Sequence, residues 1–162
     1  MTRSTARQER RAATLDDPSF EGLRTPRARR LLAAALVAVL ALEAAMLLAA
    51  EIVPMIVWIP VMVILVFALV MALGALKAST RGIEELSPEV LDERQNEIRG
   101  LVFARSYQVL SVTSLVSLLV LLTAAAGWWD ASPEALAAVV VIAFQLVITI
   151  PTLVTALHPK AG

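Results

Sequence analysis

The chain has no cysteine and a single histidine, His158, among its 162 residues. Without cysteine it forms no disulfide, no iron–sulfur cluster and no cysteine-bound zinc site, and it has no thiol nucleophile. A lone histidine provides no histidine pair for a metal ion, and we expect neither a metal nor another cofactor. Glycine-rich phosphate loops, G-x-S-x-G elbows and H-E-x-x-H pairs are also missing from the sequence. We therefore predict that the protein is not an enzyme.

Aromatic residues make up only 5% of the chain. The first thirty residues contain eight arginines but one aromatic residue, Phe20, so they lack the stacking platform of a single-stranded nucleic-acid binder. We predict no nucleic-acid partner. The low apolar content of this segment predicts that 1–30 form a flexible, Arg-rich cytosolic tail. The basic cluster at its end could lie on anionic lipid or serve only as a topology signal, which we favour: Arg24, Arg27, Arg29 and Arg30.

Apolar residues dominate the rest of the sequence. They make up 59% of the chain, and the mean hydropathy is +0.77, well above the 45–50% apolar content of soluble domains. We predict an all-α fold, a four-helix transmembrane bundle over 31–162, with the lipid bilayer as its surroundings. The expected spans are about 31–53, 54–76, 107–128 and 133–157, and a cytosolic loop and helical stem over 77–106 separates the second span from the third.

The distribution of charge predicts the orientation of these spans. The tail and the 77–106 segment contain all the basic residues but Lys160, whereas the two short turns contain acids and no Lys or Arg. The positive-inside rule therefore places both termini and the long loop in the cytoplasm of a cell-membrane protein. Trp58, Trp128 and Trp129 then lie at the outer interface, which indoles prefer.

The segment 87–106 carries the signals of a helix that begins in water and continues into lipid. Ser87 is a good N-cap, Pro88 fits the first helical position, and Glu89 suits the positive end of the helix dipole. No further proline occurs before Pro133, so we predict one helix from Pro88 to about Ala126, which extends the third helix into the cytoplasm.

One face of this stem is apolar where it lies outside the membrane, with Leu91, Ile98 and Leu101 next to Val102. An apolar stripe outside the membrane needs to be covered. We favour packing against the chain itself or against a second copy of it, and the alternative is another protein. An acidic edge of Glu89, Glu93 and Glu97 at intervals of four points to a basic partner surface, because like charges at this spacing repel.

A short charged motif at the start of the stem resembles that of a known group of proteins. Leu91-Asp92-Glu93-Arg94, followed by Ile98, Ala104 and Ser106, is similar to a family of small, uncharacterised prokaryotic membrane proteins with about four spans and an Asp-Glu-Arg motif on a cytosolic stem. The resemblance covers about twenty residues and implies no activity. It implies that Asp92, Glu93 and Arg94, with Arg99 one heptad after Asp92, form a functional cytosolic motif.

Three polar residues are expected near the middle of their spans: Glu43, Ser117 and Gln145. At one depth they could hydrogen-bond across the bundle, with Glu43 neutral in the low-dielectric interior. We favour a structural clamp of this kind. The alternative is a proton-coupling carboxylate, since four-span small multidrug transporters also carry a glutamate in their first helix. Aromatic residues that would hold an organic cation near Glu43 are missing.

These features predict a non-enzymatic multipass membrane protein. We expect an interaction or regulatory subunit that acts through its cytosolic stem, as a homo-oligomer or with a membrane or cytosolic protein partner. The alternative is a proton-coupled small-molecule transporter that uses Glu43. The two classes differ in whether Glu43 has to titrate.

Overall fold

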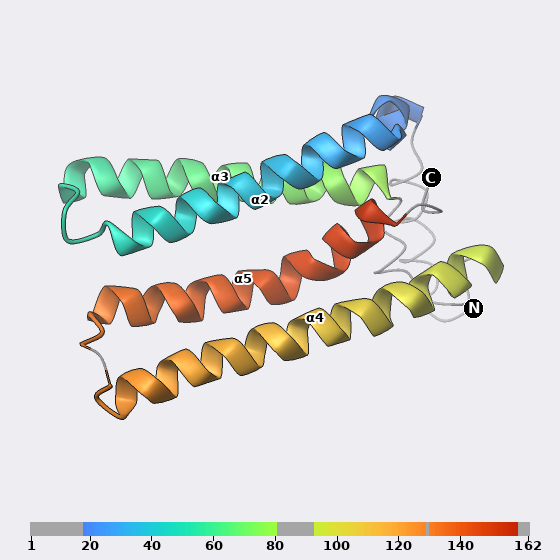
Figure 1. The fold of residues 1–162 in the computed structure, drawn as a ribbon. Coiled ribbons are helices and arrows are strands. Elements are labelled where there is room, and N and C mark those ends of the chain that lie inside the picture. Colours follow the sequence, from blue (N-terminus) through green and yellow to red (C-terminus); the bar gives the residue numbers. More distant parts are fainter. Residues whose placement is uncertain (1–17, 81–92, 129, 159–162) are drawn as a thin grey trace, which may run out of the picture.

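The protein was analysed as a computed structural model, which describes residues 18–80, 93–128 and 130–158 (Figure 1). The described residues form a short 3-10 helix followed by four long α-helices, and they contain no strand. The elements are η1 (Pro18–Arg24), α2 (Pro26–Leu48), α3 (Met55–Ser79), α4 (Glu93–Ala125) and α5 (Pro133–Leu157). The predicted all-α, four-helix architecture is confirmed.

Local sequence signals explain where α2 and α5 begin. Thr25 is the N-cap of α2, and its hydroxyl accepts a hydrogen bond of 3.2 Å from the Ala28 N–H. Ser132 caps α5 in the same way, accepting from the Ala135 N–H at 3.3 Å. A proline follows each cap at the first helical position, where it has no helical N–H bond to lose.

The end of α4 is set by Gly127. Its φ of 72° lies in the left-handed region that glycine adopts without strain. The Trp128 N–H donates to the Thr123 carbonyl at 3.1 Å and the Gly127 N–H donates to the Ala124 carbonyl at 3.0 Å. These two bonds form a Schellman motif, which satisfies carbonyls at the helix end and reverses the chain toward α5.

The four α-helices form two antiparallel hairpins, α2–α3 and α4–α5, with α5 between α4 and the first hairpin (Figure 1). α2 packs against α3 and α5, and α3 also contacts α5, while α5 is the one substantial neighbour of α4 within the described residues. The start of α2, the end of α3, the start of α4 and the end of α5 meet at one end of the bundle.

The buried apolar core is small and lies between α2, α3 and α5. It consists of Ala33, Leu36, Leu40, Leu69, Leu76 and Ala156. Large side chains such as Phe67, Leu115 and Phe144 are instead exposed on the outside of the bundle. Each α-helix is long and apolar enough to cross a membrane, and 23 residues of helix extend about 35 Å against a hydrocarbon core of about 30 Å. The exposed apolar surface is therefore lipid-facing surface, and the protein is a multipass membrane protein.

The helix bounds refine the predicted spans. α2 begins at Pro26 and ends at Leu48, five residues before the predicted end of the first span, and 49–54 form the turn to α3. α4 is continuous through Gly100 and its 33 residues extend about 50 Å. The predicted helix start at Pro88 lies outside the described residues. Within the predicted tail, η1 packs on α2 and α3, so 18–24 belong to the bundle.

Candidate functional site

Glu43 lies inside the bundle on the face of α2 that packs against its neighbours. This face repeats at helical spacing through Arg29, Ala33, Leu36 and Leu40, all of which are buried. The side chain of Glu43 has 0% of its surface exposed, and neither carboxylate oxygen has a hydrogen-bond partner. Because α2 ends at Leu48, Glu43 lies about 8 Å from the end of the helix rather than at its middle.

Gln145 on α5 lies near the carboxyl group of Glu43, although no hydrogen bond joins the two side chains in the structure. Its own Oε1 atom is buried and accepts no hydrogen bond in the structure. The pair therefore has unused hydrogen-bonding capacity on both sides. A neutral carboxyl group could donate its O–H to Gln145 Oε1 while the Gln145 amide donates to the other carboxyl oxygen. This arrangement suits a clamp between α2 and α5.

Ser117, the third member of the predicted polar cluster, is half-buried on α4. The structure brings Glu43 and Gln145 close together, whereas Ser117 lies on α4, which packs against α5 and has no substantial interface with α2. The sequence could not predict this difference, because equal depth in the membrane does not determine which helices are neighbours.

A row of buried threonines follows Gln145 along α5. Thr149, Thr152 and Thr155 are all buried. The Thr149 hydroxyl donates to the Gln145 carbonyl at 3.0 Å, and the Thr155 hydroxyl donates to the Pro151 carbonyl at 2.8 Å. Such bonds let a hydroxyl enter an apolar interior without a partner on another helix. The apolar pattern that predicts the fourth span gives no signal for the role of these threonines.

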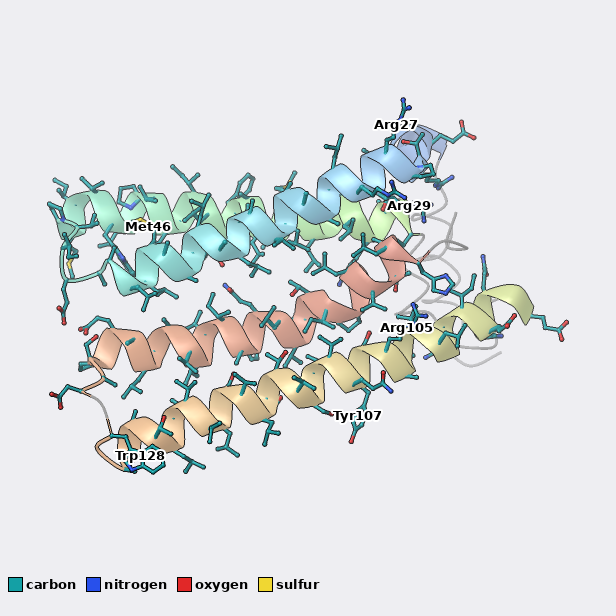
Figure 2. The ribbon with its side chains drawn as sticks, viewed as in Figure 1. Arg27, Arg29, Met46, Arg105, Tyr107 and Trp128 are labelled. Carbon is teal, nitrogen blue, oxygen red and sulfur yellow. The ribbon has the colours of Figure 1, made fainter. Side chains whose placement is uncertain are left out.

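The predicted lipid-facing basic cluster divides into two groups in the structure. Arg27 and Arg30 are exposed, and Figure 2 shows Arg27 at the start of α2. Arg29 is only 5% exposed, and its Nε and Nη1 atoms are buried without a hydrogen-bond partner. Arg24 is half-buried. Arg29 departs from its predicted lipid-facing position because it shares the core-facing side of α2 with Ala33 and Leu36.

The stem has one covered face and exposed side chains on both flanks. Ile98, Val102 and Ser106, four residues apart, are all buried. Arg99 is half-buried, and its guanidinium lies 5.0 Å from the centre of the Phe103 ring, a cation–π contact. Leu101 and Phe103, which are two residues apart and therefore lie on opposite flanks of the helix, are each 46% exposed. The covered face fits the expectation that part of the apolar stripe packs on its own chain.

The predicted cytosolic motif falls at the very start of this helix. Glu93 and Arg94 lie in the first turn of α4, where the side chain of Glu93 is exposed. Asp92 lies outside the described residues. Arg99, the fourth member, is the residue that contacts Phe103. The motif's proposed role in function remains a prediction.

The two ends of the bundle differ in chemistry. Arg27, Arg29 and Arg105 lie at one end and Trp128 at the other (Figure 2). The acidic residues Glu51 and Glu134 interact with each other at the tryptophan end. The described part of the chain contains no cluster of three or more His, Asp or Glu residues that could hold a metal ion. Comparison of the chain with protein-family models, curated proteins and solved structures found no match.

Proposed function

We propose that the protein is a non-enzymatic interaction or regulatory subunit of the cell membrane that acts through the stem of α4. The observation that carries this proposal is the start of α4: its first turns extend past the ends of the other helices (Figure 1), and two large apolar side chains in its charged first half, Leu101 and Phe103, are exposed. These residues precede Tyr107, where the continuous apolar part of the helix begins. Burying a large apolar side chain is worth about 1.5–3 kcal/mol, so a partner that covers Leu101 or Phe103 would gain stability.

The orientation supports the same proposal. Arg27, Arg29 and Arg105 lie at the end where the stem projects (Figure 2), and positively charged ends of membrane bundles remain in the cytoplasm. The stem would then face cytosolic proteins or the stem of a second copy. The Arg99–Phe103 contact presents a cation beside an aromatic ring, a combination common at protein–protein interfaces.

Co-purification in a mild detergent, followed by measurement of the mass of the intact complex, tests this proposal. We expect a homo-oligomer or a complex with another protein, which the double variant Leu101→Ser, Phe103→Ser converts to the monomer. Glu97→Gln is the matched control, since Glu97 is exposed on the same stem but is not apolar. A wild-type protein that runs only as a monomer would reject the proposal.

A second candidate function, proton-coupled transport, is favoured by the carboxyl group of Glu43, whose oxygens have no hydrogen-bond partner. Buried ionisable residues in membrane spans often belong to proton pathways. Against this candidate, Glu43 has no exposed surface, so a substrate would reach it only if α2 and α5 separated. We therefore favour a structural role for Glu43, as a clamp between α2 and α5, and rank proton-coupled transport as the second candidate function.

A further inference from the structure

An open apolar groove of about 510 Å³ runs along the outside of the α2–α5 interface. Its floor on α2 is formed by short side chains, chiefly Ala34, Ala38 and Ala41, and its other wall is formed by Leu153 and Leu157 of α5. Short side chains such as these permit close helix packing, but no helix of the described chain covers them, and Ala34, Ala38 and Ala41 are exposed. The volume lies within the range of about 300–1,000 Å³ that is typical of small-molecule sites.

The length of the groove along α2 matches the thickness of one lipid leaflet. Its lining on α2 extends from Arg30 to Ala41, which is about 17 Å of helix. This is roughly half of the ~30 Å hydrocarbon core. The groove thus begins at the level of the lipid headgroups at the basic end of the bundle and stops near the middle of the membrane.

The charge at the mouth of the groove selects the kind of headgroup. Arg30 lines the groove at its outer end, and Arg27, one turn earlier, lies on the same side of α2 and is exposed. Both guanidinium groups are free to form the forked hydrogen bonds that arginine makes with phosphate oxygens. The lining below Arg30 is apolar throughout, so it suits an acyl chain.

We propose that this groove is a binding site for one anionic phospholipid of the leaflet at the basic end. An acyl chain fills the space between Ala34, Ala38 and Leu153, and the headgroup phosphate lies against Arg30 and Arg27. This site is separate from the exposed side chains of the stem and from the Glu43–Gln145 pair. A bound lipid would complete the α2–α5 contact from outside, where short alanine side chains leave it open.

Native mass spectrometry of the detergent-solubilised protein tests the site with two probes, phosphatidylglycerol and phosphatidylcholine with the same acyl chains. We expect phosphatidylglycerol to bind more tightly, and Arg30→Gln to reduce that preference about fivefold, since one cation near a membrane surface is worth about 1 kcal/mol. Ala38→Leu should lower the binding of both lipids because it fills the groove. Arg105→Gln and Ala137→Leu, exposed positions outside the groove, should change neither.

Each other outcome overturns the proposal. Equal binding of the two lipids would show that Arg30 and Arg27 do not bind the headgroup. A preference for phosphatidylglycerol that survives both Arg30→Gln and Arg27→Gln would show the same. Lipid binding that is unchanged in Ala38→Leu would show that the lipid does not bind in this groove. A dimer that Ala38→Leu dissociates, with no retained lipid, would assign the groove to a second copy of the chain. Melting curves of each variant show that it remains folded while binding is measured.

Discussion

The indole N–H of Trp58 donates a hydrogen bond of 2.8 Å to the carbonyl oxygen of Met46. Met46 lies two residues before the end of α2, and the N–H that would ordinarily bond its carbonyl, that of Ala50, donates to Leu47 instead. The carbonyl is thus one of the groups that a helix end leaves without an internal partner. Trp58, in the first turn of α3, supplies the missing donor and ties the hairpin together.

We expect Trp58→Phe to lower the free energy of unfolding by about 1 kcal/mol, because the ring remains while the donor is lost. Thermal unfolding in detergent, followed by circular dichroism, measures the change. Trp128→Phe is the control, since Trp128 is 79% exposed and its loss should have little effect. Equal stability of wild type and Trp58→Phe would show that the hydrogen bond does not secure the hairpin.

Substitution of Glu43 separates the clamp from the transporter. Glutamine keeps the shape of the side chain and can both donate to and accept from Gln145, so Glu43→Gln should unfold at the wild-type temperature or slightly above. Glu43→Leu should lower the stability if the clamp forms, because it leaves the half-buried amide of Gln145 beside an apolar side chain that cannot hydrogen-bond to it. The measurement is again thermal unfolding in detergent.

The same variant tests transport directly. An amide does not titrate, so proton coupling through Glu43 cannot survive in Glu43→Gln. With purified protein in liposomes we expect no uptake of organic cations driven by a pH gradient, for either wild type or variant. Uptake by the wild type that disappears in Glu43→Gln would establish the transporter and reject the clamp as the main role of this residue.

Orientation can be measured with single cysteines, because the natural chain contains none. Cysteine at Asp130, which is exposed in the α4–α5 connection, should react with an impermeant reagent in intact cells. Cysteine at Glu97, exposed on the stem, should react only after the cells are opened. The reverse pattern would invert the proposed topology.

Continuity of α4 between stem and membrane has a direct spectroscopic test. Spin labels at Glu93 and Ser114, both exposed, should give a narrow distance distribution centred near 32 Å plus the contribution of the linkers, from a rise of 1.5 Å per residue. A broad or much shorter distribution would indicate a break, for which Gly100 is the weakest position, about 1 kcal/mol worse than alanine.

The sequence was sufficient to predict the elements of this fold. Four apolar runs determine the spans, and Thr25-Pro26 and Ser132-Pro133 act as the caps that their chemistry predicts. These are local signals, in which a helix start or a span depends on residues close together in the chain. A polar cluster of Glu43, Ser117 and Gln145 was predicted, because a carboxyl group inside a membrane bundle needs polar neighbours, and in the structure Glu43 lies near Gln145.

The remaining features depend on how the helices are arranged. Arg29 was grouped with the exposed arginines, but its position on α2 turns it into the core. Ser117 was expected beside Glu43, but α4 is not a neighbour of α2. The hydrogen bond from Trp58 to Met46 depends on α2 ending at Leu48, and the apolar span continues beyond that residue. The apolar pattern of the sequence indicates which segments lie in the membrane. It does not indicate which face of a helix packs against which neighbouring helix.

The central position of α5 has a consequence for how the molecule is made. α5 is the last of the four helices in the chain, yet it is the helix against which both α4 and the α2–α3 hairpin pack. During synthesis α2 and α3 can pair as soon as both have left the ribosome, whereas α4 must wait in the membrane without its main neighbour. A chain stopped before Pro133 would lack the helix that joins α4 to the α2–α3 hairpin, so the complete bundle forms only after α5 has been made.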